Sequence, residues 1–134
     1  SERFYRRFCE EWLPPIRAQF PEPAGDPATW SPTQRVYYEY HHPDIYYPDS
    51  FRVYPAHLHI DLLPRAQGRG QGKRMMEWML ETLVGKGSPG VHLGLSAANE
   101  RAYRFYLKLG FVELARVGAT TPQVIYMGRK LGFR

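Results

Sequence analysis

The stretch Gln67-Gly68-Arg69-Gly70-Gln71-Gly72-Lys73 alternates glycine with long polar side chains, and the interpretation of the whole chain begins with it. An apolar segment at 57–63 ends in Pro64 just before it, and a helix-forming segment follows at 74–80. Glycine has no Cβ, so the backbone can turn sharply and an anion can approach its N–H groups closely. A helix that begins at once adds unpaired N–H donors and the positive end of its dipole. The stretch therefore predicts an anion site, most simply for phosphate.

The elements around this stretch form a β-α-β pattern. Strands are expected at 56–63 and 91–95, with a helix at 71–86 between them. Such strands pair in parallel, which places the glycine stretch at the carboxyl end of the first strand, where open α/β sheets bind ligands. The remaining expected elements are a helix at 99–109 and two strands at 111–117 and 124–129, which a turn at Gly118–Pro122 joins. The expected fold class is α/β (α+β), with a mixed central sheet flanked by helices.

Apolar spacing predicts which faces of two helices are buried. Residues 2–20 carry an aromatic or aliphatic residue at every fourth position, and Pro14 and Pro15 are expected to split them into a helix and a short second turn. The crossover helix at 71–86 is expected to bury one apolar stripe, made of Met75, Met76, Trp78, Met79, Leu80 and Leu83.

A helix start is encoded in Ser31-Pro32-Thr33-Gln34, with serine as N-cap, proline at the first helical position and glutamine three residues after the cap. This helix should stop before Pro43. A strand at 36–40 is the alternative, because valine and tyrosine favour strands. We expect one domain, 1–134, in which 1–55 form a helical insertion and connection and 56–134 form the core.

Composition limits the classes of function. The chain has 134 residues, 43% of them hydrophobic, and no apolar run approaches the roughly 20 residues that span a bilayer. Its single cysteine, Cys9, excludes an internal disulfide and a cysteine-based zinc site, and it fits a reducing, cytoplasmic setting. The net charge of +5 is spread along the chain, whereas nucleic-acid binders usually carry a denser basic stripe. We therefore expect neither a membrane nor a nucleic-acid partner.

Two common phosphate-binding loops do not match. A Walker A loop needs Ser or Thr after its lysine, but Arg74 follows Lys73, and the spacing from Gly68 to Lys73 is one residue short. The glycine spacing also differs from the dinucleotide Gly-x-Gly-x-x-Gly pattern. A mobile, glycine-rich turn without a ligand stays open as the structural alternative.

The arrangement resembles the GNAT superfamily of N-acetyltransferases, whose coenzyme A loop reads Gln/Arg-x-x-Gly-x-Gly/Ala. Gln67, Gly70 and Gly72 occupy those positions, and the segment from Asn99 to Phe111 is similar to the family's Asn-x-x-Ala-x-x-Phe-Tyr-x-x-x-Gly-Phe pattern. The resemblance covers about residues 56–130. Within the family, the chain looks like bacterial proteins related to the C-terminal acetyltransferase-like domain of O-GlcNAcase.

This resemblance implies an acetyl-CoA-dependent N-acetyltransferase that acetylates a primary amine of a small molecule or peptide by direct attack. The backbone of Leu62 and Leu63 would pair with pantetheine, the N–H groups from Gly68 to Lys73 would hold the pyrophosphate, and Tyr106 would protonate the leaving thiolate. Simple core packing is the alternative for Tyr106. The full implied set of cofactor-binding residues is Leu62, Leu63, Gln67, Gly68, Arg69, Gly70, Gln71, Gly72, Lys73, Asn99, Ala102 and Tyr106.

A row of titratable residues offers candidates for the general base. His57, His59 and Asp61 alternate, so they share one face of their strand. Asp61 and then His59 are the preferred bases because they lie nearest the carboxyl end of the strand, although all three could simply face solvent. No metal site is expected.

Two expectations concern what the resemblance leaves open. GNAT proteins normally begin with about three strands, and nothing in residues 1–55 looks like them. The strand at 56–63 would then carry an unpaired edge, so we expect a missing N-terminal segment or a second copy of the chain to cover it. The alternative function is a catalytically inactive domain that binds CoA or another protein.

Overall fold

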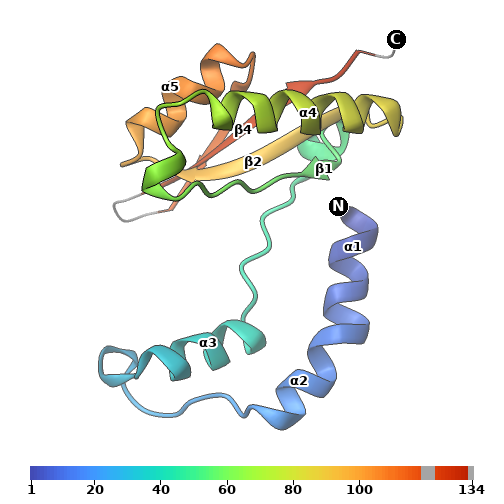
Figure 1. Cartoon of the computed structure of the whole chain (residues 1–134). Helices are drawn as coiled ribbons and strands as arrows, with labels where there is room; N and C mark the ends of the chain where they lie inside the picture. The colour runs from blue at the N-terminus through green and yellow to red at the C-terminus, as the bar shows by residue number, and fades with distance from the viewer. Residues whose placement is uncertain (119–122, 133–134) are drawn as a thin grey trace. The chain divides into compact units, whose positions relative to one another are not determined.

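The computed structural model describes residues 1–118 and 123–132, and the chain forms two compact units, Ser1–Pro48 and Asp49–Arg134 (Figure 1). The expected turn between the last two strands falls largely on residues 119–122, which lie outside the described residues. None of the helices in the described residues has the length and apolar character that crossing a bilayer requires.

The first unit begins with one helical path in which the prolines change the helix type without ending it. Helix α1 (Glu2–Arg7) continues through a π-helical segment (Phe8–Trp12) into α2 (Leu13–Gln19). Pro14 lies in the first turn of α2, where a missing N–H is tolerated. The expected split into a helix and a short second turn is therefore wrong. A single wide π turn, closed by the Leu13 N–H on the Phe8 carbonyl, replaces it.

The second helix of this unit begins where the capping pattern predicts. Helix α3 (Pro32–His41) has Ser31 as its N-cap, and both reciprocal bonds between Ser31 and Gln34 are present. It ends before Pro43, as expected, and the alternative of a strand at 36–40 is excluded. A short 3₁₀ turn, Pro27–Thr29, lies between α2 and α3, and the Arg17 Nε donates to the Tyr40 carbonyl at 2.7 Å.

The second unit contains a four-stranded mixed sheet with the order β1-β2-β4-β3. Strand β1 (Ala56–His57) is parallel to β2 (Gly90–Ser96), which confirms the expected crossover pairing. Strands β4 (Val124–Lys130) and β3 (Val112–Val117) add antiparallel pairs, with an irregular register between Glu113 and Ala115. Short 3₁₀ turns, Asp49–Val53 and Pro64–Ala66, precede and follow β1.

Strand β1 is shorter than the sequence indicates. The expected strand spans 56–63, but only Ala56 and His57 pair with β2, and the Leu58 N–H on the His92 carbonyl, at 3.1 Å, is the last bond between the two segments. β1 lies at the edge of the sheet, so residues 59–63 have no strand on their other side within the described residues. Their strand-like pattern reflects alternating burial, and sequence alone does not show that a pairing partner is lacking.

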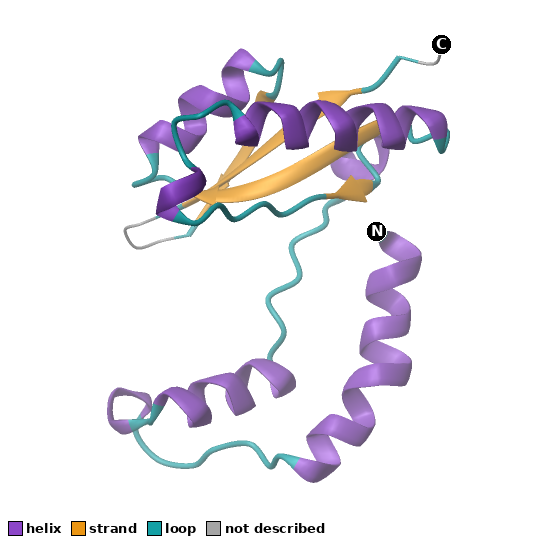
Figure 2. Ribbon diagram, in the orientation of Figure 1, coloured by secondary structure: helices purple, strands orange, loops and turns teal. Residues whose placement is uncertain are grey.

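Helices α4 (Gln71–Gly85) and α5 (Glu100–Lys108) lie over the same face of the sheet (Figure 2). The two helices and strands β2 and β4 enclose a core whose buried members include Met76, Leu80, Leu93 and Met127. The expected apolar stripe of α4 is wrong at two positions, because Trp78 is 68% exposed and Met75 is 44% exposed. Met76 and Leu80, four residues apart, face the sheet, which leaves Met75 and Trp78 on the outer side of the helix.

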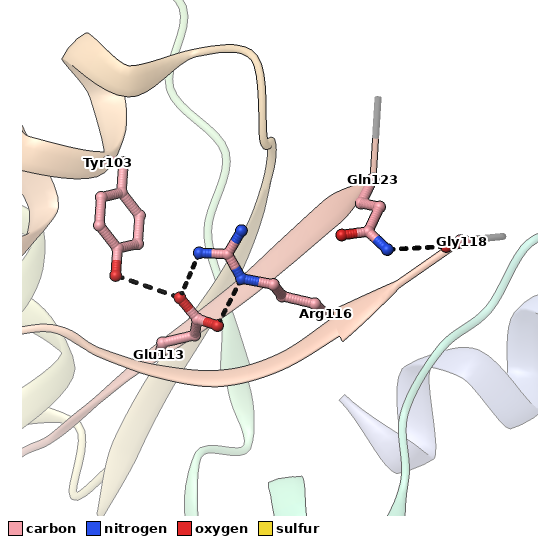
Figure 3. Close-up of polar contacts among 5 residues, drawn as sticks. All are labelled: Tyr103, Glu113, Arg116, Gly118 and Gln123. Atoms are coloured by element: carbon pink, nitrogen blue, oxygen red, sulfur yellow. Dashed lines mark hydrogen bonds and ion pairs between the residues drawn. The ribbon is translucent and has the colours of Figure 1, made fainter. Parts of the chain in front are cut away.

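An exposed polar cluster of Tyr103, Glu113 and Arg116 connects α5 to β3 (Figure 3). Tyr103 donates its hydroxyl to Glu113 at 3.1 Å, and Arg116 donates two bonds to the same carboxylate at 2.7 and 2.9 Å. Hydrogen bonding to Arg116 lowers the pKa of Glu113 below its ordinary value of 4.5. We assign this exposed cluster a structural role, because none of its members lines the cavity described below.

Candidate active site

The glycine stretch forms a turn of open N–H groups at the start of α4. Gly68 and Gly70 both have φ of +74°, in the left-handed region, and Gly70 is the N-cap of α4. No amide from residue 68 to residue 73 donates to an acceptor in the described residues, and the first helical bond beyond them joins the Arg74 N–H to the Gly70 carbonyl. A run of unpaired donors at a helix start favours an anion.

A cavity of about 610 Å³ lies beside these amides, between the glycine turn, the segment after β1, and α5. Nine residues of the expected cofactor-binding set line it: Leu62, Gln67, Gly68, Gly70, Gly72, Lys73, Asn99, Ala102 and Tyr106. Five further lining residues were missed by sequence reasoning: Ile60, Arg101, Phe105, Lys108 and Leu109. Arg101, Phe105 and Lys108 lie on α5 and Leu109 is its C-cap, so a helical projection of residues 99–109 could have found these four.

The segment after β1 runs along the cavity without pairing to β2. No backbone hydrogen bond joins residues 59–63 to β2. Alternation places Ile60 and Leu62 on the cavity side, and the Leu62 carbonyl accepts a bond from the Gln67 Nε2 at 2.9 Å. An extended ligand with amide groups can therefore pair with this open edge.

Gln67 joins two walls of the cavity. Its Nε2 is bonded to the Leu62 carbonyl, and its Oε1 accepts a bond from the Arg101 Nη1 at 3.1 Å. Gln67 precedes α4 and Arg101 lies in the first turn of α5, so the two bonds connect segments 34 residues apart. This link fixes the side chain of Gln67 at the cavity wall.

Asn99 has a structural task that its sequence motif does not reveal. It is the N-cap of α5, and its Oδ1 accepts a bond from the Ala102 N–H at 3.1 Å. The amide oxygen is thus used within the protein. The NH₂ group makes no hydrogen bond in the described residues and stays available to a ligand.

Tyr106 is the buried titratable group of the cavity. It is 8% exposed and packs edge-on against Phe105 and Phe111, with ring centroids 5.3 and 5.6 Å away. Burial raises the pKa of its hydroxyl above the ordinary 10.0, and the Asp61 carboxylate raises it further. Tyr106 therefore stays protonated at neutral pH and can donate a hydrogen bond, but it is a poor base.

The three candidates for the general base lie in two different environments. His59 Nε2 is 2.8 Å from Asp61 Oδ2, and both side chains are more than three-quarters exposed (76% and 88%). His57 instead stacks on the buried His92, with ring centroids 4.8 Å apart and planes 8° from parallel. Burial lowers the pKa of His57 and of His92 below the ordinary 6.5. His59 and Asp61 thus form an accessible pair, whereas His57, although exposed, is stacked on a buried ring.

Five residues of the expected site do not line the cavity. His59 and Asp61 lie on the segment whose other residues, Ile60 and Leu62, do. The others are Leu63, which is 61% exposed, and Arg69 and Gln71, whose side chains lie outside the cavity. No group of three or more His, Cys, Asp or Glu side chains in the described residues could hold a metal ion.

A glycine turn that opens a crossover helix, a segment that leaves the sheet after β1 and a buried tyrosine surround one cavity of this α/β unit. Residues 44–111, half of the chain, match the profile of the acetyltransferase (GNAT) family. The chain therefore belongs to the GNAT family.

Three known proteins are similar to this chain. SsHAT, known from a crystal structure, shares 40% sequence identity with this chain and has a TM-score of 0.77. The match covers 98% of this chain and 62% of that one. The rat (Rattus norvegicus) protein O-GlcNAcase is 25% identical over 96% of this chain, and the chain spans only 14% of its length. The structure of yncA from Salmonella typhimurium, solved with its cofactor acetyl-CoA, shares the fold at 22% identity and a TM-score of 0.54, over 68% of this chain and 56% of that one.

Proposed function

We propose that this chain binds acetyl-CoA in the cavity and transfers the acetyl group to a primary amine by direct attack. The observation that carries the proposal is the run of unpaired amides at residues 68–73 beside a cavity of about 610 Å³. Membership of the GNAT family supports the reaction class, and the yncA structure supports acetyl-CoA as the donor. The SsHAT and O-GlcNAcase likenesses extend over nearly the whole chain, and neither name specifies an amine.

The residues present fit the parts of this donor. The amides of residues 68–73 and the start of α4 would hold its diphosphate. The free backbone edge at Ile60 and Leu62, together with the Asn99 NH₂ group, would pair with its pantetheine amides. Leu63 is excluded from the cavity lining, so only its backbone could contribute.

When bound, acetyl-CoA supplies an activated thioester carbonyl that an amine can attack, with a thiolate as leaving group. Tyr106 would donate its hydroxyl hydrogen to that sulfur, because its raised pKa keeps it protonated at neutral pH. Backbone N–H groups at Ile60 or Leu62 would stabilise negative charge on the carbonyl oxygen. No nucleophilic side chain of the protein is needed.

The amine must lose a proton, and the His59–Asp61 pair is the accessible acceptor. A carboxylate bonded to one imidazole nitrogen orients the ring and leaves the other nitrogen free to take the proton. Neither His59 nor Asp61 lines the cavity, but the Asp61 carboxylate lies close enough to Tyr106 to raise the pKa of its hydroxyl. A His59→Gln variant that turns over at the wild-type rate would remove His59 from this role.

Release of free thiol from acetyl-CoA, measured over a panel of peptide and small-molecule amines, tests the proposal. Turnover on at least one amine, dependent on enzyme concentration, is the expected result. CoA binding without turnover on any amine would indicate a catalytically inactive CoA-binding domain instead. A folded protein that neither binds CoA nor releases thiol would contradict both functions.

A further inference from the structure

The cavity contains one arginine whose charge is not neutralised by the protein. Three cationic side chains line it: Lys73, Arg101 and Lys108. Lys73 lies 3.6 Å from the Glu77 carboxylate. Arg101 forms no ion pair in the described residues.

Arg101 is held in place although it has no counterion. Its Nη1 donates to the Gln67 Oε1 at 3.1 Å, and Gln67 is itself fixed to the Leu62 carbonyl. One of the five guanidinium N–H donors is thereby used, and the others make no hydrogen bond in the described residues. Arg104, on the same helix, contrasts with this, because it pairs with Glu100 at 3.0 Å and does not line the cavity.

The chemistry of this side chain matches one part of the donor. A guanidinium is a planar group of N–H donors that binds phosphate oxygens in pairs, and a held side chain loses little entropy on binding. The pantetheine arm is uncharged, so it offers no anion to Arg101. The phosphate groups are the only anions in CoA.

We propose that Arg101, positioned by Gln67, binds a phosphate group of CoA and makes the site selective for phosphorylated carriers over phosphate-free pantetheine thioesters. The inference rests on the proposed function, since it names a contact within the same cavity. The phosphate in question is either the diphosphate, which the amides of residues 68–73 also face, or the 3′-phosphate. The two sources share the same chemistry and are separated by the choice of ligand below.

Calorimetric titration tests the inference with three ligands: CoA, dephospho-CoA and pantetheine. The variants are Arg101→Gln, which removes the charge and keeps the helix propensity, and Arg104→Gln as the matched control on the same helix. We expect Arg101→Gln to weaken CoA binding about tenfold or more, as for loss of a charged hydrogen bond, and to leave pantetheine binding unchanged. Arg104→Gln should bind all three ligands like the wild type.

The ligand series identifies the phosphate. If Arg101→Gln binds CoA more weakly than the wild type does but binds dephospho-CoA equally well, Arg101 contacts the 3′-phosphate. If its affinity for both ligands falls equally, Arg101 contacts the diphosphate. Unchanged CoA affinity in Arg101→Gln, or an equal loss with pantetheine, would overturn the inference while leaving the proposed function intact. A folded wild-type protein that binds no CoA would overturn the proposed function as well.

The positioning role of Gln67 has its own readout. Gln67→Leu removes both bonds of the link, so it should weaken CoA binding by less than Arg101→Gln does. In the double variant the loss should not exceed that of Arg101→Gln alone, because both changes remove the same contact. Fully additive losses would contradict positioning through Arg101.

Discussion

Gly70 and Gly72 both line the cavity, but each needs to be glycine for a different reason. Gly70 has φ of +74° and nothing within 4 Å of the position of an added Cβ, so only its backbone conformation excludes a side chain. Gly72 has an ordinary helical conformation, but an added Cβ would lie 3.1 Å from Leu62 Cδ1 and 3.4 Å from Phe105 Cζ. The first glycine shapes the turn and the second keeps the cavity open.

Alanine substitutions should separate these two roles. Gly70→Ala should lower the free energy of unfolding by about 1–2 kcal/mol, the penalty for a left-handed residue with a Cβ. Gly72→Ala should change it by less than about 1 kcal/mol, because alanine favours a helix and the two contacting side chains can shift. Both should weaken CoA binding. Urea unfolding and calorimetry measure the two effects, and a stable Gly70→Ala variant with full affinity would contradict this account of the turn.

Tyr106 is the residue whose substitution should affect chemistry more than binding. Removing the hydroxyl in Tyr106→Phe takes away the proton donor and keeps the ring contacts with Phe105 and Phe111. We expect kcat to fall about 10²- to 10⁴-fold, the usual contribution of general acid catalysis, with little change in CoA affinity. Tyr103→Phe is the matched control, since Tyr103 bonds to Glu113 outside the cavity. Equal kcat values for the two variants would exclude Tyr106 as the acid.

At the scale of elements, α5 combines a structural end with a ligand-facing side. Asn99→Ala removes the N-cap acceptor and should lower the free energy of unfolding by about 1 kcal/mol. Asn99→Asp keeps the acceptor and should preserve stability, but it replaces the NH₂ donor with a charged oxygen. Both variants should therefore weaken CoA binding, whereas only the alanine should unfold more readily in urea. Wild-type CoA affinity in Asn99→Asp would show that this amide does not bind the donor.

The sequence predicts the elements that local signals define. The capping pattern at Ser31, the glycine turn before α4 and Gly110 at the end of α5 mark helix ends by specific backbone chemistry, and the structure confirms each of those helices within a residue or two. Much of the cavity lining follows from the same signals, because family motifs and helical spacing both point to α5.

What the sequence does not predict depends on distant partners. Residues 59–63 alternate like a strand, yet strand pairing needs a neighbour, and β2 pairs only as far as Leu58. Trp78 is apolar and lies on an amphipathic helix, but α4 packs against the sheet on one side only. The Arg101–Gln67 bond joins residues 34 positions apart, so no local pattern contains it.

At the scale of the whole molecule, the second unit has a stacked histidine pair, of which His92 is buried, that should make its stability depend on pH. His92 is 1% exposed, stacks on His57 and is bonded through Nδ1 to the Tyr54 carbonyl at 2.6 Å. Burial lowers both pKa values below 6.5, so the folded protein binds fewer protons than the unfolded chain at mildly acid pH. The stabilisation is complete above pH 6.5 and is lost as the pH falls through the lowered pKa values.

Urea unfolding between pH 7 and 5.5 measures this dependence. The free energy of unfolding should fall over that interval in the wild type, and the fall should be smaller in His92→Gln, which removes one of the two titrating groups. The variant should also be less stable at pH 7, where the packing of His92 is lost. Equal slopes in the two proteins would show that the histidine pair is not responsible.

The most direct test of the central claim, that the amides of residues 68–73 and the adjoining cavity bind acetyl-CoA, is calorimetric titration of acetyl-CoA into the wild-type protein. Two temperatures are needed, because the enthalpy of binding can pass through zero at one of them. We predict saturable binding with one acetyl-CoA per chain. No heat at either temperature, from protein shown to be folded by circular dichroism, would contradict the account.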